Sequence, residues 1–366
     1  MSAGVYVHVP FCLTRCGYCD FNAYAGLGEL APRYVRALHR EAELTGPDWA
    51  GEEIVSVFVG GGTPTTLEVA DLTGVFADLR ERFEVEPDAE VTIEGNPDTV
   101  DEVKLEGLLA AGYERLSMGA QSFDVDVLSA LERVHSPTSV RRAFAAARAV
   151  GYANVSLDLI YGANGETVDS WGRTLEETIA LAPEHVSAYA LTIEPSTPLG
   201  RKVQSGLVPA PDPDVQADMF EMACGLLSEA GYHHYEVSNW AKPGFECVHN
   251  LGYWERRPYV GLGAGAHSYR DDRRWWNVRP PQEYLDRVEA GVLPVGGHER
   301  LEPSDAYLEE VFLRLRILEG VPASWIEPAK AEPFLESGLL EEHEGALVPT
   351  ERGMLLLNKL VLALTG

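Results

Sequence analysis

Strand-like and helix-like stretches alternate along the first two hundred residues, and this alternation constrains the fold more than any other feature. Six short apolar stretches have the character of buried strands: 5–9, 54–59, 90–94, 115–118, 154–160 and 185–191. Helical periodicity fills the intervals, at 32–44, 68–83, 101–110, 124–150 and 170–181. Repeated β-then-α units require a parallel sheet with right-handed crossovers. The sequence therefore predicts an α/β fold, a partial (β/α)6 barrel, with an open doubly wound sheet as the alternative.

The rest of the chain is expected to divide into further parts. The barrel part is assigned to residues 1–230, and a helix-rich region is expected to begin at residue 214. Residues 231–300 are dense in aromatic side chains and glycine. Residues 301–366 are expected to form a winged-helix-like C-terminal cap that covers a site. Its expected elements are helical stretches at 304–318, 334–340 and 351–364 and a hairpin at 344–349.

The chain is strongly acidic, with 57 Asp and Glu residues against 29 Lys and Arg residues and a formal net charge of −28. Such a surface repels phosphate backbones, so we do not expect a nucleic-acid partner. Apolar residues make up 45% of the chain and charged residues 23%, which is typical of a globular protein and argues against disorder.

No targeting or membrane segment is expected. Residues 5–11 alternate like a strand and lack the apolar stretch of a secretory signal. The apolar run 354–364 is interrupted by Asn358 and Lys359 and is too short to cross a bilayer. We therefore expect a cytosolic protein without an integral membrane segment.

Three of the five cysteines form a tight motif, Cys12-x3-Cys16-x2-Cys19, directly after the first predicted strand. Clustered cysteines without a secretory signal indicate metal ligation and not a disulfide framework. Thiolates are the usual ligands of iron–sulfur clusters, and three of them leave the fourth iron of a 4Fe–4S cluster free for a small molecule. A zinc site completed by His8 or a distant cysteine is the alternative, but zinc loops favour Cys-x2-Cys pairs.

Polar or glycine-rich residues follow the other predicted strands. The stretch 60–64 contains three glycines, and Glu94, Gln121 and Asp158 stand at later strand ends. Functional residues of parallel barrels gather at the C-terminal ends of strands. Consecutive glycines let a ligand approach the backbone, and we expect their N–H groups to be free to bind a carboxylate. Each residue alone could be a turn or a helix cap, but together they predict a site.

The stretch from Tyr6 to Phe21 resembles the radical S-adenosylmethionine (SAM) superfamily, specifically the branch that contains anaerobic coproporphyrinogen III dehydrogenase and the HemW-type haem chaperones. The resemblance covers essentially the whole chain. It implies that the unique iron of the cluster chelates SAM and that the reduced cluster cleaves it to a 5′-deoxyadenosyl radical. It also implies that Gly61, Gly62 and Thr63 hold the methionine end of SAM. Further implied pocket residues are Tyr6, Glu94, Gln121, Arg133, Asp158 and Ala190. Glu94 and Asp158 would accept from ribose hydroxyls or the ammonium group, and Arg133 would pair with a carboxylate.

Two departures favour the chaperone branch. The dehydrogenase carries a further cysteine where this chain has Phe21, and it has an extension before the motif, whereas only eleven residues precede Cys12 here. Residues 249–254 match the H-N-x-x-Y-W motif of the chaperones. The resemblance implies that His249 binds haem iron and that Tyr253 and Trp254 offer ring faces. Cys247 and His267 are alternative ligands, and a hydrogen-bonded interior histidine is the alternative explanation of His249.

The sequence therefore predicts a chaperone that binds haem and transfers it to haem-requiring acceptor proteins. The cluster and SAM would support or regulate the transfer, with a homodimer as one arrangement and with peripheral contact to a membrane during delivery. The alternative is a radical enzyme similar to oxygen-independent coproporphyrinogen III oxidase, which would form 5′-deoxyadenosine in a substrate-dependent way. A purely structural iron–sulfur scaffold would leave the polar strand ends without a purpose.

Overall fold

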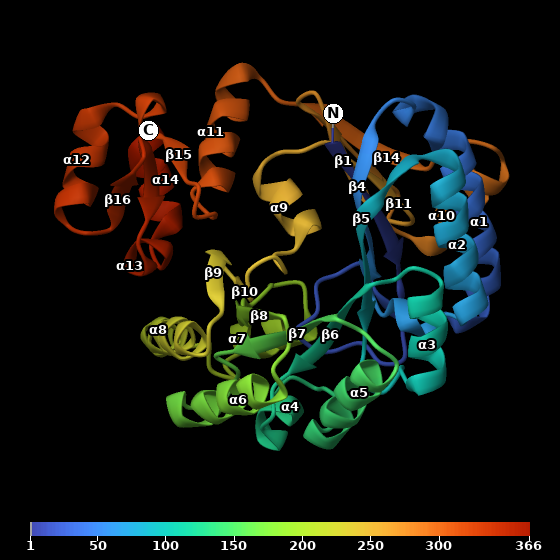
Figure 1. Cartoon of the computed structure of the whole chain (residues 1–366), viewed down its shortest axis with the longest axis horizontal. Helices are drawn as coiled ribbons and strands as arrows, with labels where there is room; N and C mark the ends of the chain where they lie inside the picture. The colour runs from blue at the N-terminus through green and yellow to red at the C-terminus, as the bar shows by residue number, and fades with distance from the viewer. Residues whose placement is uncertain (1) are drawn as a thin grey trace.

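The computed structural model describes residues 2–366 and confirms the predicted α/β barrel (Figure 1). Six parallel strands lie side by side in chain order. They are β1 (Ser2–Val9), β4 (Glu53–Gly61), β5 (Glu84–Gly95), β6 (Arg115–Gln121), β7 (Asn154–Tyr161) and β8 (His185–Ala190). Consecutive residues such as 155–157 of β7 are fully buried, as in a sheet covered on both faces.

Helices connect these strands and cover the outside of the curved sheet (Figure 1). They are α1 (Ala31–Thr45), α2 (Val69–Arg82), α3 (Glu102–Ala110), α4 (Val125–Ala130), α5 (Pro137–Ala149) and α6 (Val168–Leu181). The helical stretch expected at 124–150 is broken into α4 and α5. Glu132 adopts a left-handed conformation with φ of 54°, and Ser136 then caps α5 with Pro137 in its first turn. Because of this break, Arg133 lies at the C-terminal ends of the parallel strands.

Residues 198–300 extend the same sheet at both edges and also contain four helices, so the expectation of a helix-rich region is only partly correct. The first two helices are α7 (Pro198–Gln204) and α8 (Pro213–Glu229). At one edge, β10 (Asn239–Ala241) pairs with β8, and β9 (His233–Glu236) pairs with β10. At the other edge, β11 (Tyr259–Leu262) pairs in parallel with β1. Three antiparallel strands follow: β12 (His267–Arg270), β13 (Arg273–Asn277) and β14 (Val295–Arg300). The complete order is β14-β13-β12-β11-β1-β4-β5-β6-β7-β8-β10-β9.

The other two helices of this region pack on different parts of the barrel. Helix α9 (Val248–Trp254) contacts β1 and β4, whereas α10 (Pro281–Glu289) packs on α1. Two short strands, β2 (Phe11–Cys12) and β3 (Tyr24–Ala25), pair in parallel and frame the cysteine motif. Single 3-10 turns complete the chain: η1 (Gly28–Leu30), η2 (Gly46–Trp49), η3 (Pro64–Thr66) and η4 (Ala323–Trp325).

The C-terminal cap has the predicted winged-helix-like composition, a three-stranded antiparallel sheet and helices. Its elements are α11 (Pro303–Arg314), β15 (Val321–Pro322), α12 (Pro328–Glu336), β16 (Leu340–His343), β17 (Ala346–Pro349), α13 (Glu351–Met354) and α14 (Leu357–Thr365). The helix expected at 334–340 is wrong in position, because Gly338 with φ of 68° ends the turn that follows α12. The helix expected at 351–364 is interrupted between α13 and α14.

The cap packs beside α9, which lies between α11 and β1 (Figure 1). Val237 N–H donates to the Arg316 carbonyl at 2.9 Å, and Arg256 forms ion pairs with Glu309 and Glu310. Among residues 2–366, no helix combines the length and apolar character needed to cross a membrane.

Candidate functional site

The C-terminal ends of the six parallel strands open into a cavity of about 550 Å³. All thirteen residues predicted for the site line this one cavity. They are Tyr6, Cys12, Cys16, Cys19, Gly61, Gly62, Thr63, Glu94, Gln121, Arg133, Asp158, Ala190 and His249. The structure therefore brings together side chains from every strand of the barrel, as the rule for parallel barrels predicts.

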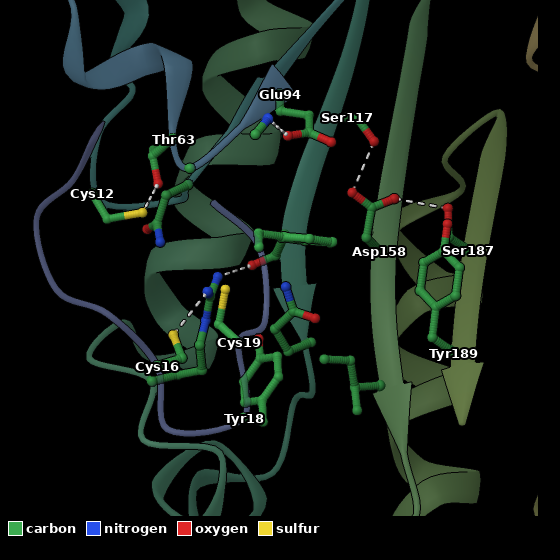
Figure 2. Close-up of a pocket in the computed structure, with 18 of the residues that line it drawn as sticks. Cys12, Cys16, Tyr18, Cys19, Thr63, Glu94, Ser117, Asp158, Ser187 and Tyr189 are labelled. Carbon is green, nitrogen blue, oxygen red and sulfur yellow. Dashed lines mark hydrogen bonds between the residues drawn. The ribbon is translucent and has the colours of Figure 1, made fainter. Parts of the chain in front are cut away.

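Cys12 ends β2, Cys16 and Cys19 lie on the loop between β2 and β3, and each of the three is partly exposed (Figure 2). Cys19 N–H donates to the Cys16 carbonyl at 3.2 Å, and Leu199 N–H donates to the Gly17 carbonyl at 2.9 Å. Among residues 2–366, no group of three or more His, Cys, Asp or Glu side chains converges on a point where one metal ion would fit. Each ligand of a 4Fe–4S cluster binds its own iron, so this donor set suits a cluster better than a single zinc ion.

Two arginines, Arg133 and Arg15, place positive charge near these thiols, and Arg133 contacts a sulfur directly. Its Nη1 donates to Cys16 Sγ at 3.4 Å and its Nη2 to the Gly119 carbonyl at 2.9 Å. Its Nε is buried and has no hydrogen-bond partner. A partly desolvated cation favours deprotonated thiols and an anionic group in front of it. The positive charge of Arg133 therefore complements an anionic cluster or a ligand carboxylate.

The N–H groups of the glycine stretch at the end of β4 are hydrogen-bonded within the protein, whereas we expected them to be free. Gly61 N–H donates to Glu94 Oε2 at 2.9 Å, Gly62 N–H to the Val9 carbonyl at 2.8 Å, and Thr63 N–H to the Phe11 carbonyl at 2.8 Å. That expectation is wrong, because neighbouring strand ends use all three donors.

The glycines instead permit close packing of the cysteine loop. A Cβ on Gly62 would lie 2.7 Å from the Phe11 carbonyl oxygen and 3.0 Å from Cys12 Sγ, both too close. Thr63 Oγ1 donates to Cys12 Sγ at 3.6 Å (Figure 2). Gly62 and Thr63 therefore fix Cys12 against the end of β4.

Glu94 and Tyr6 stand near the centre of the cavity wall. Burial raises the pKa of Glu94 to about 7, with the nearby Asp158 carboxylate adding to the shift and the Gly61 N–H opposing it. The Tyr6 hydroxyl and His8 Nδ1 are 2.9 Å apart, and His8 Nε2 lies 3.0 Å from the Asn22 carbonyl. The tyrosine is therefore tied to the loop that follows the cysteines.

Asp158 on β7 is held by three serine hydroxyls. Ser117 donates to Oδ2 and Ser187 to Oδ1, both at 2.8 Å (Figure 2). Ser156 also donates to Oδ1, at 3.0 Å. A carboxylate has about four lone-pair positions, so one remains for a ligand. The sequence analysis missed Ser156 and Ser187, although a serine inside an apolar strand was a signal for a polar partner across the sheet.

Two further predicted residues lie at the ends of β6 and β8. Gln121 has φ of 63°, a strained conformation for a residue other than glycine, and its Nε2 lies over Gly119 with Arg133 Nη2 close by. Ala190 is exposed at the end of β8 and leaves the cavity mouth open there.

His249 lies at the deep end of the cavity and is only 3% exposed. Its Nδ1 is 2.9 Å from Ser56 Oγ, and its Nε2 is 2.9 Å from the Tyr253 hydroxyl. The ring stacks on Phe58 with centroids 5.1 Å apart. Burial lowers the pKa of His249 to about 3 and keeps it neutral. Both ring nitrogens are engaged, so iron could reach Nε2 only if the Tyr253 hydroxyl moved away.

The cap does not cover this cavity. None of residues 301–366 lines it, and the cap contacts α9 from outside the barrel. The expectation that the cap covers the site is therefore wrong.

Replacing Asp158 is expected to separate its structural role from ligand binding. Asp158→Ala leaves three serine hydroxyls without an acceptor and should lower the free energy of unfolding by about 1–3 kcal/mol. Asp158→Asn keeps acceptors and should cost less stability, while both variants bind SAM about three- to tenfold more weakly. Urea unfolding and calorimetric titration with SAM measure the two effects. Unchanged SAM affinity in both variants would remove Asp158 from the binding site.

A partial barrel with a three-cysteine loop at the strand ends is the architecture of the radical SAM superfamily, and residues 6–178 match the family model of that superfamily. Residues 301–356 match the model of the HemN C-terminal domain. A haem chaperone HemW of Mycobacterium tuberculosis is 44% identical over 99% of this chain and 95% of its own length. The haem chaperone HemW of Escherichia coli is 34% identical over 98% and 96%. The chain belongs to the HemW family.

The solved structure of coproporphyrinogen III oxidase (HemN) from Escherichia coli, a radical SAM enzyme, has the same overall fold. It superimposes with a TM-score of 0.85 and 25% identity, over 99% of this chain and 90% of that one. The likeness extends through the cap as well as the barrel.

Proposed function

We propose that this protein binds haem and transfers it to haem-requiring acceptor proteins, with a SAM-bound 4Fe–4S cluster that supports or regulates the transfer. The observation that carries the proposal is the similarity to curated haem chaperones over nearly the full length of both chains. A second argument comes from Phe21, which occupies the position where the dehydrogenase of the same branch carries a further cysteine.

In this proposal the cluster is bound by Cys12, Cys16 and Cys19, with Arg133 balancing its charge. SAM lies in the cavity of about 550 Å³ between the cluster and the ends of β5 to β8. When bound and reduced, the cluster supplies the electron that cleaves SAM. Glu94 and Asp158 accept hydrogen bonds from SAM, while Tyr6, Gln121 and Ala190 shape the walls. Gly61, Gly62 and Thr63 contribute by holding Cys12 and Glu94 in position.

The division of the chain follows from these roles. Residues 1–230 hold the cluster and SAM, residues 231–300 contribute the residues that face haem, and residues 301–366 support α9 from outside. Delivery would take place in the cytosol, with peripheral contact to a membrane where the acceptor is a membrane protein. A homodimer is one arrangement in which the SAM-bound cluster would regulate haem transfer.

In this proposal, the role of His249 depends on its contact with the Tyr253 hydroxyl. Direct ligation of haem iron by His249 requires its Nε2 to exchange the 2.9 Å contact with the Tyr253 hydroxyl for iron. Without that exchange, His249 positions Tyr253 and thereby acts on haem indirectly.

The alternative function is a radical enzyme that acts on a porphyrinogen, and the likeness to HemN from Escherichia coli favours it. The two functions differ in what happens to SAM. A radical enzyme forms 5′-deoxyadenosine in proportion to substrate consumed, whereas a chaperone has no such substrate.

The first experiment is an anaerobic haemin titration of the protein with its cluster reconstituted. We expect a saturable shift of the Soret band with one haem per chain, followed by transfer of haem to an apo-acceptor protein. Absence of saturable binding, together with 5′-deoxyadenosine formed in the presence of coproporphyrinogen III, would reject the chaperone and favour the enzyme.

A further inference from the structure

A second cavity, of about 580 Å³, lies beside the first and opens between the cysteine loop and strands β11 to β13. The two cavities share a wall made of Tyr6, Asp20, Phe21, Gly61, Glu94 and Tyr253. None of the cysteines lines the second cavity, so the proposed cluster site does not extend into it. A ligand there would lie against the SAM site without occupying it.

His267 at the start of β12 offers this cavity an open imidazole. It is exposed, and among residues 2–366 no hydrogen bond uses either of its ring nitrogens. Its ring stacks on Trp276, its cross-strand partner on β13, with centroids 5.6 Å apart and planes 27° apart. Partial burial and the nearby Arg279 and Arg274 lower the pKa of His267, which favours the neutral form that binds metals.

Arg279 supplies an unpaired cation in the same cavity. Its guanidinium forms no hydrogen bond or ion pair with residues 2–366, although the chain carries twice as many acidic as basic residues. Its carbonyl accepts from Asn22 Nδ2 at 2.9 Å, which fixes the backbone at the edge of the cavity. Two carboxylates, Asp20 and Glu94, also face the cavity, so an anionic ligand would orient its charge toward Arg279.

The remaining lining combines His8 and Asn22 with several aromatic rings. Tyr253 and Tyr259 meet edge to face with centroids 4.7 Å apart, and Phe21 on the cysteine loop is 64% exposed. Gly265 and Ala266 also line the cavity, and the Asn22 side chain packs closely against Gly265.

We infer that the second cavity is the haem site, that His267 is an axial ligand of the haem iron, and that Arg279 binds a propionate. The inference rests on the proposed haem-binding function and names its site. A planar, apolar, anionic metal complex satisfies all of these features together: the free imidazole, the unpaired guanidinium and the aromatic walls. His249 then acts as a positioning residue, because its Nε2 holds the Tyr253 hydroxyl at the wall shared with the SAM cavity.

The test is a haemin titration of the cluster-loaded full chain, followed by Soret absorption and resonance Raman spectra, for the wild type and four variants. His267→Ala is expected to lose the wild-type iron ligation and to bind haemin at least about tenfold more weakly. Added imidazole should restore the wild-type spectrum. Arg279→Gln should weaken binding about three- to tenfold without changing the ligation. His249→Ala should weaken binding without changing the ligation.

His298→Ala is the matched control. His298 is an exposed histidine on β14 of the same sheet, opposite Trp275 and therefore on the other face from Trp276 and His267. It should behave as the wild type.

A wild-type ligation spectrum in His267→Ala, or loss of that ligation in His249→Ala alone, would overturn the inference and leave the haem-binding function standing. Absence of saturable binding to the wild-type protein would reject both. Unchanged cluster content and circular dichroism in each variant establish that the fold is intact.

Discussion

Cys16→Ala is expected to reduce the iron and sulfide content of the anaerobically reconstituted protein to background and to abolish SAM binding at the cluster. Cys16 is one of three thiols available to a cubane in this cavity, and removing it leaves only two. The change also leaves Arg133 Nη1 without its 3.4 Å sulfur partner, next to an Nε that already has no acceptor. Iron and sulfide analysis with calorimetric SAM titration measures the result.

Cys224→Ala is the control for this experiment. Cys224 is a buried cysteine of α8 that does not line the cavity, so its variant should retain the cluster and SAM binding. A wild-type iron content in Cys16→Ala would mean that the three-cysteine assignment is wrong.

Glu94→Gln is expected to weaken SAM binding about 10- to 100-fold at pH 8, because a hydrogen bond to a charged group contributes about 1.5–3 kcal/mol. The glutamine keeps the size of the side chain and an oxygen that can accept from Gly61 N–H. Since the pKa of Glu94 is raised to about 7, SAM affinity of the wild type should fall as the pH drops through 7. The variant should lack this pH dependence.

The stability of the SAM-free protein should change in the opposite direction. Glu94 has a pKa of about 7 in the folded chain against 4.5 ordinarily, so between these pH values the folded chain retains a proton that the unfolded chain releases. Stability contributed by the protonated group is therefore present below pH 4.5 and lost as the pH rises through 7. At pH 8, SAM-free Glu94→Gln should be more stable than the wild type in urea unfolding.

Glu166→Gln separates the two effects. Burial also raises the pKa of Glu166 to about 7, but Glu166 does not line the cavity and instead accepts from Gly162 and Ala163 N–H. This variant should share the pH-dependent gain in stability and bind SAM normally. Equal SAM affinity in Glu94→Gln and Glu166→Gln would contradict a role of Glu94 in binding.

Much of the architecture could be predicted because the patterns involved are local. Each of the six parallel strands is a short apolar stretch followed by a helical period, and the chain order then fixes the sheet order. The same logic brought thirteen residues to one cavity, since parallel strands end at a common edge. The spacing of the three cysteines is visible in the sequence alone.

The errors concern contacts between distant segments. The N–H groups of Gly61, Gly62 and Thr63 are used by Glu94, Val9 and Phe11, and spacing alone does not reveal partners of this kind. His249 is engaged by Ser56, which lies 193 residues earlier in the chain, so its availability could not be read from its motif.

The aromatic segment was harder to assign because its strands are only three to six residues long and pair at opposite edges of the sheet. Glycine is frequent there and aromatic residues are scattered, so no clear period of two is visible.

The parallel pairing of β11 with β1 has a consequence for how this protein can be divided. Strand β1 carries Tyr6 and lies between β4 and β11, and residues 259–262 pair with its residues 4–7. A fragment that ended near residue 230 would expose the backbone groups on this side of a long apolar strand, a template for pairing with other chains. We therefore expect the barrel and the aromatic segment to fold together, because β11 completes the sheet beside β1.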